Sequence, residues 1–171
     1  MTANVAARIA SVGKEHFRAV MSEVCSPVTV ITSIEDGVPH GTTVSAFASL
    51  SLEPPMVSVA LDRGSDLLRM VRRSRRIGVN VLAQSQRELA VAFARKGGDK
   101  FAGVQWTSDS GLPRLTNAAG WLACEVEELV AGGDHVILLA HVTTAAVQAS
   151  LPLTYHRRGY GTHTPFEAWR A

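Results

Sequence analysis

Short segments rich in β-branched residues recur along this chain, and residues typical of tight turns separate them. Residues 28–34 are β-branched almost throughout, Asp36-Gly37 is a strong hairpin signal, and residues 38–45 follow as a second strand. The same pattern predicts strands over 56–61, 77–81, 121–129 and 135–144, and one more within 153–160. Many strands at short spacing favour an antiparallel barrel over a doubly wound parallel sheet.

Three segments have the period of an amphipathic helix. The first carries an apolar stripe at i, i+3, i+4 and i+7, formed by Phe17, Val20, Met21 and Val24. Ser65 is a candidate N-cap for a second helix over 66–75. Residues 85–88, Ser-Gln-Arg-Glu, fit a capping box at the start of a third helix, which Gly97-Gly98 ends. Residues 102–119 are expected to be a loop.

Length and charge narrow the possible classes of protein. A chain of 171 residues fits one domain, and a net charge of +2 gives no reason to expect a nucleic-acid partner. No apolar run approaches the roughly 20 residues that cross a bilayer, so no membrane association is expected. Residues 1–10 lack the pattern of a secretory signal, which makes the cytoplasm the expected location.

The cysteines and histidines do not predict a metal site. Cys25 and Cys124 are far apart, and Cys124 alternates with apolar neighbours as on the buried face of a strand, so a structural role is predicted for both. His135 and His141 are six residues apart in a predicted strand, which separates them by about 20 Å. They cannot share an ion.

Residues 41–55 interleave hydroxyl-bearing and apolar side chains, with no charge before Glu53. Few polar groups in an apolar wall suit a large planar ligand with a polar tail. An ordinary Ser/Thr-rich strand and turn is the alternative. No Gly-x-Gly-x-x-Gly motif follows a predicted strand and no Walker loop is present, so hydroxyls, loop amides and basic side chains would have to hold any phosphate.

The run Gly-Thr-Thr-Val-Ser-Ala-Phe at 41–47, with Ser-Leu-Ser-Leu-Glu-Pro-Pro at 49–55, resembles the flavin reductase family with the FMN-binding split-barrel fold. Members of this family are the small reductase components of two-component flavin-dependent monooxygenases. The likeness continues, in the family's order, at 78–82 (Gly-Val-Asn-Val-Leu), 100–101 (Lys-Phe), 133–135 (Gly-Asp-His) and 152–155 (Pro-Leu-Thr-Tyr). It covers roughly residues 14–162 and leaves 1–13 and 163–171 as tails.

This resemblance implies a mainly β protein, a split barrel of Greek-key-like antiparallel strands with a few peripheral helices. It implies an NAD(P)H:flavin oxidoreductase that passes a hydride from NADH to FMN or FAD and supplies diffusible reduced flavin to a separate monooxygenase. A homodimer with the site near the subunit interface is also expected. The alternative is a non-enzymatic flavin carrier of the same fold, although a carrier has no need of the Gly-Asp-His motif. The choices between FMN and FAD, and between NADH and NADPH, stay open.

The resemblance also implies which residues form the site. Flavin contacts are expected from Thr43, Val44, Ser45, Ala46, Ser49, Ser51, Ser65, Asn80, Val81, Leu82, Gln86, Lys100 and Phe101. The phosphate would meet Ser65, Arg95, Lys96 or Lys100. His135 is expected to position the nicotinamide cofactor, with Tyr155 as a stacking neighbour.

Five arginines at positions 69, 72, 73, 75 and 76 fall on or beside the second predicted helix. The simplest interpretation is the solvated face of that helix. The alternative is a cluster that attracts anionic cofactors or an acidic partner enzyme. The cluster lacks interleaved aromatic residues, which argues against nucleic-acid binding.

Overall fold

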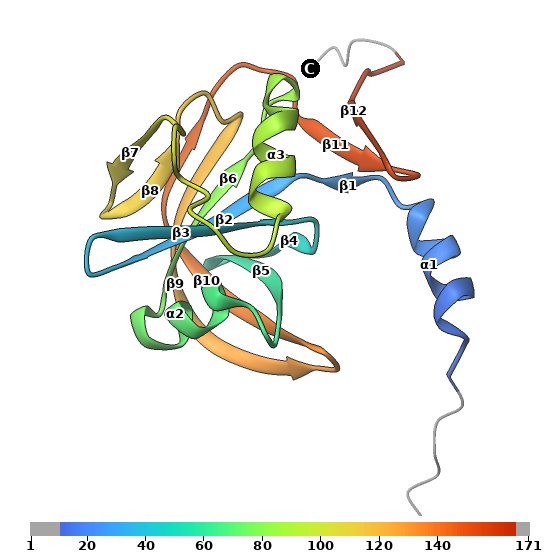
Figure 1. Ribbon diagram of the computed structural model, residues 1–171, viewed down its shortest axis with the longest axis horizontal. Helices are drawn as coiled ribbons and strands as arrows, with labels where there is room; N and C mark the ends of the chain where they lie inside the picture. Colours follow the sequence, from blue (N-terminus) through green and yellow to red (C-terminus); the bar gives the residue numbers. More distant parts are fainter. Residues whose placement is uncertain (1–10, 167–171) are drawn as a thin grey trace, which may run out of the picture.

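Seven antiparallel strands form the main sheet in the computed structural model, which describes residues 11–166 (Figure 1). They are β2 (Thr29–Glu35), β3 (Val38–Val44), β4 (Phe47–Leu52), β5 (Pro55–Asp62), β6 (Arg76–Val81), β9 (Gly120–Gly132) and β10 (His135–Val147). Their order across the sheet is β3-β2-β6-β9-β10-β5-β4. The predicted strands and the Asp36-Gly37 hairpin are confirmed, with φ angles of 50° and 77° at the turn.

The sheet curls because its two outermost strands are consecutive in the chain. Only Ser45 and Ala46 separate β3 from β4, so the two edges of the sheet must come together. The N–H of Ala60 on β5 donates to the carbonyl of Ala46 at 2.9 Å, and this hydrogen bond joins β5 to the connection between β3 and β4. The result is the predicted split barrel, and its seam lies between β3 and β5.

Two small sheets complete the β structure. One contains β1 (Ser26–Pro27), β11 (Leu153–His156) and β12 (Gly159–Thr162), so the single strand expected within 153–160 is a hairpin. The other pairs β7 (Trp106–Asp109) with β8 (Leu112–Leu115), and the loop predicted over 102–119 is therefore wrong in part. A Ser110-Gly111 turn with φ angles of 52° and 71° joins β7 to β8.

The three predicted helices are present as α1 (Lys14–Ser22), α2 (Asp66–Ser74) and α3 (Arg87–Ala94). The N-cap predicted at Ser65 is confirmed, because its Oγ accepts the N–H of Leu68 at 3.4 Å. The capping box predicted at 85–88 is wrong. A 3-10 turn (Gln84–Gln86) precedes α3, and the Oε1 atom of Gln86 accepts the N–H of Ala83 at 3.0 Å.

Apolar side chains form three clusters among the described residues, and the smallest consists of Leu112, Trp121 and Ala123. The barrel interior includes Ile31, Val59 and Leu138 and is covered at one end by α2, whereas Phe93 of α3 packs into a second cluster on the outside of β2 and β3. In contrast, α1 stands away from the barrel (Figure 1), and its apolar stripe is exposed.

The two cysteines have different environments. Cys124 is buried on β9, as predicted, whereas Cys25 is exposed and therefore does not have the structural role expected of it; both are free thiols. No group of three or more His, Cys, Asp or Glu among residues 11–166 could hold a metal ion. None of the helices in this part of the chain is long and apolar enough to cross a membrane.

Candidate functional site

A groove follows the seam of the barrel and consists of two adjoining cavities. The first, of about 220 Å³, is lined by residues 42–46 at the end of β3, residues 60–62 at the end of β5, Ser65 and His135. The second, of about 290 Å³, shares Thr42, Asp62 and Ser65 with the first and continues toward the end of α3. The groove is continuous because these three residues line both cavities.

Hydroxyl groups fix the end of β3 beside the first cavity. Thr29 Oγ1 donates to the carbonyl of Val44 at 2.7 Å, and Thr43 Oγ1 donates to the carbonyl of Ala90 in α3 at 2.7 Å. Ser45 and Ala46, which follow, are exposed, and their N–H groups have no hydrogen-bond acceptor within the part of the chain that the structure describes. The first cavity therefore has free backbone donors on a rigid strand end.

His135 lies in the first cavity, at the start of β10. The tight turn at Gly133, with φ of 66°, places His135 opposite Asp62 of β5 in the sheet register. Its side chain is 43% exposed, and its Nδ1 atom lies 2.7 Å from Oδ1 of Asp134. This contact holds the pKa of the Asp134 carboxyl below its usual value. The imidazole is thus oriented by Asp134 where it lines the first cavity.

Basic side chains gather around the second cavity, where Ser65 is joined by His40, Arg95, Lys96 and Lys100. The Nζ atom of Lys100 donates to the carbonyl of Phe93 at 3.0 Å, and burial lowers the pKa of this ammonium group. An anion suits this end of the groove, because charged donors and the N-terminus of α2 converge there.

Two carboxylates also line the second cavity, and each has a local partner. Oδ1 of Asp62 accepts the N–H of Gly64 at 2.7 Å. Asp66 forms an ion pair with Arg69. These contacts reduce the repulsion that the two carboxylates would exert on a bound anion.

The structure brings part of the predicted site together. Nine of the predicted residues line the groove: Thr43, Val44, Ser45, Ala46, Ser65, Arg95, Lys96, Lys100 and His135. Other lining residues, among them His40, Thr42 and Asp62, were not predicted. Thr42 was within the singled-out run, but His40 and Asp62 reach the groove only because β3 and β5 meet at the seam, which no local pattern reveals.

Four other residues predicted to contact the flavin have side chains that make contacts within the protein. Asn80 is fully buried, where its Oδ1 accepts the N–H of Leu115 at 2.7 Å and its Nδ2 donates to the carbonyl of Val30 at 3.2 Å. Gln86 caps the 3-10 turn and donates from Nε2 to the carbonyl of Thr116 at 2.8 Å. Leu82 and Phe101 belong to the cluster beneath α3. These four side chains face the protein interior rather than the groove.

The remaining predicted residues lie at other places in the fold. Val81 pairs with Gly120 on β9, and Ser49 and Ser51 are on the outermost strand β4, away from the residues that line the groove. Tyr155 lines a third cavity, of about 340 Å³, between α1 and β11. Ser45 lines this third cavity as well as the first, so Tyr155 is next to the groove rather than inside it.

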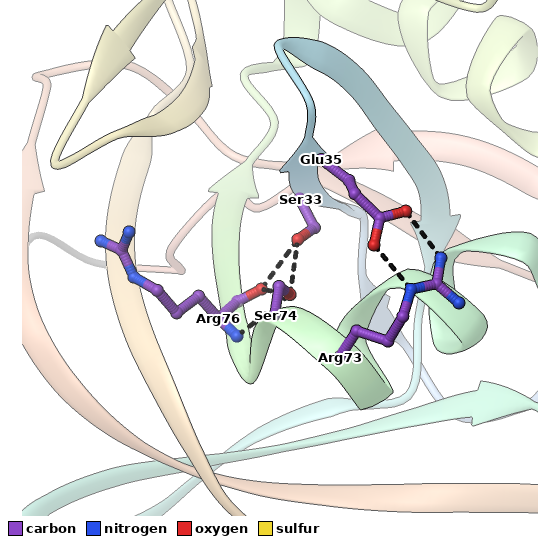
Figure 2. A network of polar contacts seen from close by, with 5 residues as sticks. All are labelled: Ser33, Glu35, Arg73, Ser74 and Arg76. Atoms are coloured by element: carbon purple, nitrogen blue, oxygen red, sulfur yellow. Dashed lines mark hydrogen bonds and ion pairs between the residues drawn. The ribbon is translucent and has the colours of Figure 1, made fainter.

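Two residues of the arginine cluster, Arg73 and Arg76, form hydrogen bonds with residues of β2 (Figure 2). Arg73 makes two hydrogen bonds of 2.6 Å to the carboxylate of Glu35 on β2, and this partner holds the pKa of Glu35 below its usual value. Arg75 ends α2 with φ of 55° and donates from Nε to the carbonyl of Val126 at 3.1 Å. Ser33 Oγ donates to the carbonyl of Arg76 at 2.9 Å. The interpretation as an outer helix face is therefore favoured over an anion-attracting cluster.

Comparison with known proteins gives a consistent result. Residues 21–164 match the model of the flavin reductase like domain. The chain is 38% identical over 159 residues to the reductase component of a 4-nitrophenol 4-monooxygenase/4-nitrocatechol 2-monooxygenase from Rhodococcus opacus, covering 92% of this chain and 86% of that protein. It is 36% identical to HsaB, the reductase subunit of a flavin-dependent monooxygenase from Rhodococcus jostii, over 94% of this chain and 83% of that subunit. Among solved structures, the NADH:FAD oxidoreductase SgcE6 of Streptomyces globisporus, in complex with NAD and FAD fragments, superposes with a TM-score of 0.85 and 28% identity, covering 92% of this chain and 99% of that chain.

Proposed function

This chain belongs to the flavin reductase like family and is an oxidoreductase, and from that premise we propose that the seam groove holds the flavin while it accepts a hydride from NADH. The observation that carries the proposal is the continuity of the groove. It joins the free amides and His135 at one end to the basic side chains of the second cavity at the other. A flavin nucleotide has a matching arrangement, with a planar ring at one end and a phosphate at the other.

The side chains present fit such a ligand. Val44, Ala46 and Ala60 offer an apolar wall for the ring, and the N–H groups of Ser45 and Ala46 offer donors to the carbonyl and nitrogen edge of the ring. Arg95, Lys96, Lys100 and the hydroxyl of Ser65 would hold the phosphate. Apart from Asp62, the described residues that line the first cavity carry no fixed charge, which suits a flavin that leaves after reduction.

The flavin and the nicotinamide supply the hydride chemistry between them. The chain contributes position and orientation. The strand end at Ser45-Ala46 is fixed by the hydroxyl bonds of Thr29 and Thr43, and a fixed site lowers the entropy cost of bringing two rings together. His135, oriented by Asp134, positions the nicotinamide cofactor at the open side of the first cavity.

The names of the relatives support a separate oxygenase partner. The Rhodococcus proteins are a reductase component and a reductase subunit of monooxygenases. By the same reasoning, this chain supplies reduced flavin to a monooxygenase. From the sequence resemblance we further propose that it acts in the cytoplasm and uses FMN or FAD with NADH in preference to NADPH.

A homodimer is part of the proposal. On α1, Phe17 is 55% exposed, Val20 57% and Met21 47%, and Val24, two residues after the end of the helix, is 48% exposed. Apolar residues gathered in this way favour contact with another protein surface. A second copy that covers α1 would also approach the groove, because Ser45 lines both the first cavity and the cavity beside α1.

Steady-state oxidation of NADH, followed by its absorbance with FMN and then FAD in molar excess, tests the function. Turnover that requires added flavin is expected. The same assay with NADPH in place of NADH measures the preference for the nicotinamide cofactor, and the assay with riboflavin in place of FMN or FAD measures the preference for the flavin. Flavin that binds without supporting any NADH or NADPH oxidation would leave only the flavin-carrier alternative. A protein that neither binds nor reduces flavin would refute both.

A further inference from the structure

His40 is a titratable residue in the second cavity that the proposed function does not yet use. It lies on β3, opposite Ser33 in the sheet register, and lines the cavity together with Lys100 and Arg95. The imidazole is half-buried, and neither of its nitrogens has a hydrogen-bond partner among the residues that the structure describes. Because neither ring nitrogen is fully buried, both are accessible to a ligand in the cavity.

We infer that His40 is a phosphate-binding residue that acts in its protonated form, so that a flavin with a phosphate monoester takes up a proton as it binds. This inference rests on the proposed function of the groove and names a further binding residue for it. The ligand class is a phosphate monoester dianion, as in FMN, rather than the flavin ring.

The charges that face His40 come from every element around the cavity. The cations are Arg69 on α2 and Arg95, Lys96 and Lys100 after α3, and the carboxylates are Asp62 at the end of β5 and Asp66 on α2. Because Asp66 is paired with Arg69 and Asp62 with a backbone N–H, the cavity keeps an excess of positive charge. In the free protein, burial first, and then Lys100 and Arg69, lower the pKa of His40, so the ring is neutral near pH 7.

A bound phosphate dianion reverses this balance. It adds negative charge beside the ring and accepts a hydrogen bond from it, so the pKa of His40 is higher in the complex than in the free protein. Protons are taken up at any pH between the two values, and affinity falls as pH rises through the higher one. The second ionisation of a phosphate monoester, with a pKa of about 6, works in the opposite direction and is nearly complete at pH 7.

Calorimetric titration at pH 7.0 in two buffers with different ionisation enthalpies measures this proton directly. Wild-type protein is expected to take up more than about half a proton with FMN and close to none with riboflavin, which lacks the phosphate. In His40→Gln, which keeps a hydrogen-bond donor but cannot change charge, FMN should bind more weakly and without uptake. His163→Gln, a change to an exposed histidine after β12, is the matched control and should behave as wild type.

Three outcomes overturn the inference while leaving flavin reduction in place. They are FMN binding without proton uptake, equal uptake with riboflavin, and uptake that persists in His40→Gln and so belongs to another group such as Lys100. If His40→Gln does not fold, equal proton uptake with FMN and riboflavin in the wild-type protein would still overturn the inference. Absence of both flavin binding and flavin-dependent NADH oxidation would instead refute the proposed function itself.

Discussion

The Nδ1 atom of His135 lies 2.7 Å from Oδ1 of its neighbour Asp134, at the tip of the β9–β10 hairpin. The contact fixes the ring direction at the edge of the first cavity. We expect His135→Ala to raise the Michaelis constant for NADH by roughly tenfold, equivalent to about 1.4 kcal/mol, while kcat at saturating NADH changes less. Stopped-flow and steady-state kinetics with saturating flavin measure both constants.

Asp134→Asn is the companion variant. The amide keeps a hydrogen-bonding group near Nδ1 but removes the negative charge, so the Michaelis constant should rise by less than in His135→Ala. A His135→Ala variant with an unchanged Michaelis constant and a lower kcat would contradict a positioning role, because the residue would then act only in the transition state.

Arg95 and Lys96 are predicted to hold the flavin phosphate. Both line the second cavity and both are exposed, so their removal should not disturb the core. We expect Arg95→Gln and Lys96→Gln each to weaken FMN binding by roughly three- to tenfold and to leave riboflavin binding nearly unchanged. Fluorescence titration at low and high salt measures the effect, which should shrink as salt screens the charges.

Arg72→Gln provides the control for this pair. Arg72 is an exposed arginine of α2 that is not among the residues lining the groove. FMN affinity should be the same as in wild type. Equal losses for FMN and riboflavin in the Arg95 and Lys96 variants would place the phosphate elsewhere.

Gly78 packs directly against the ring of Trp121. A Cβ atom at Gly78 would lie 2.4 Å from Cη2 of Trp121 and 2.5 Å from Oγ1 of Thr32, and both neighbours are buried. Gly78→Ala should therefore lower the free energy of unfolding by about 3 kcal/mol, as overpacking of a rigid core does. Urea denaturation measures it.

Gly161→Ala is the matched strand variant on β12, because its Cβ would lie 3.6 Å from Oγ1 of Thr154, an ordinary contact. It should change stability by less than about 0.5 kcal/mol. If Gly78→Ala changed the free energy of unfolding as little as Gly161→Ala, Trp121 of β9 would not pack tightly against Gly78 of β6.

The two cysteines should differ in reactivity. Burial raises the pKa of the Cys124 thiol to about 12, so almost no thiolate is present at pH 8, whereas Cys25 is exposed. A chromogenic disulfide reagent should titrate one thiol per chain in the native protein and two in denaturant. In Cys25→Ser the native protein should show none. A native count of two would mean that β9 opens readily.

Local signals predicted most of the fold but only part of the lining of the groove. The Asp36-Gly37 turn and the β-branched runs specify strands through short-range sterics, and Ser65 specifies a helix start through one hydrogen bond. The β7–β8 hairpin was missed because Gly103, Gly111 and Pro113 resemble loop residues, although Ser110-Gly111 is itself a tight turn.

The site was harder to predict because burial separates residues that share a motif. Asn80 and Leu82 lie in the same sequence run, yet they face the interior, where Asn80 holds β8 and Leu82 packs beneath α3. His40 and Asp62 belong to no motif and meet only across the seam. Sheet order, which depends on the whole chain, decides which side chains reach the groove.

The exposed stripe of α1 leads to the last prediction, on assembly. Phe17 and Met21 lie one turn apart on the same side of a helix that stands away from the barrel (Figure 1), so a second copy is proposed to cover them. Met21→Glu should place a charge in that interface and halve the mass measured by light scattering.

Ala19→Glu is the matched control, because Ala19 is an exposed residue on the opposite side of α1. It should leave the mass unchanged. The third cavity, between α1 and β11, shares Ser45 with the first, so loss of the dimer should also weaken flavin binding. A wild-type protein with the mass of one chain would contradict the homodimer. A monomeric Met21→Glu variant with wild-type flavin affinity would show instead that the groove is complete within one chain.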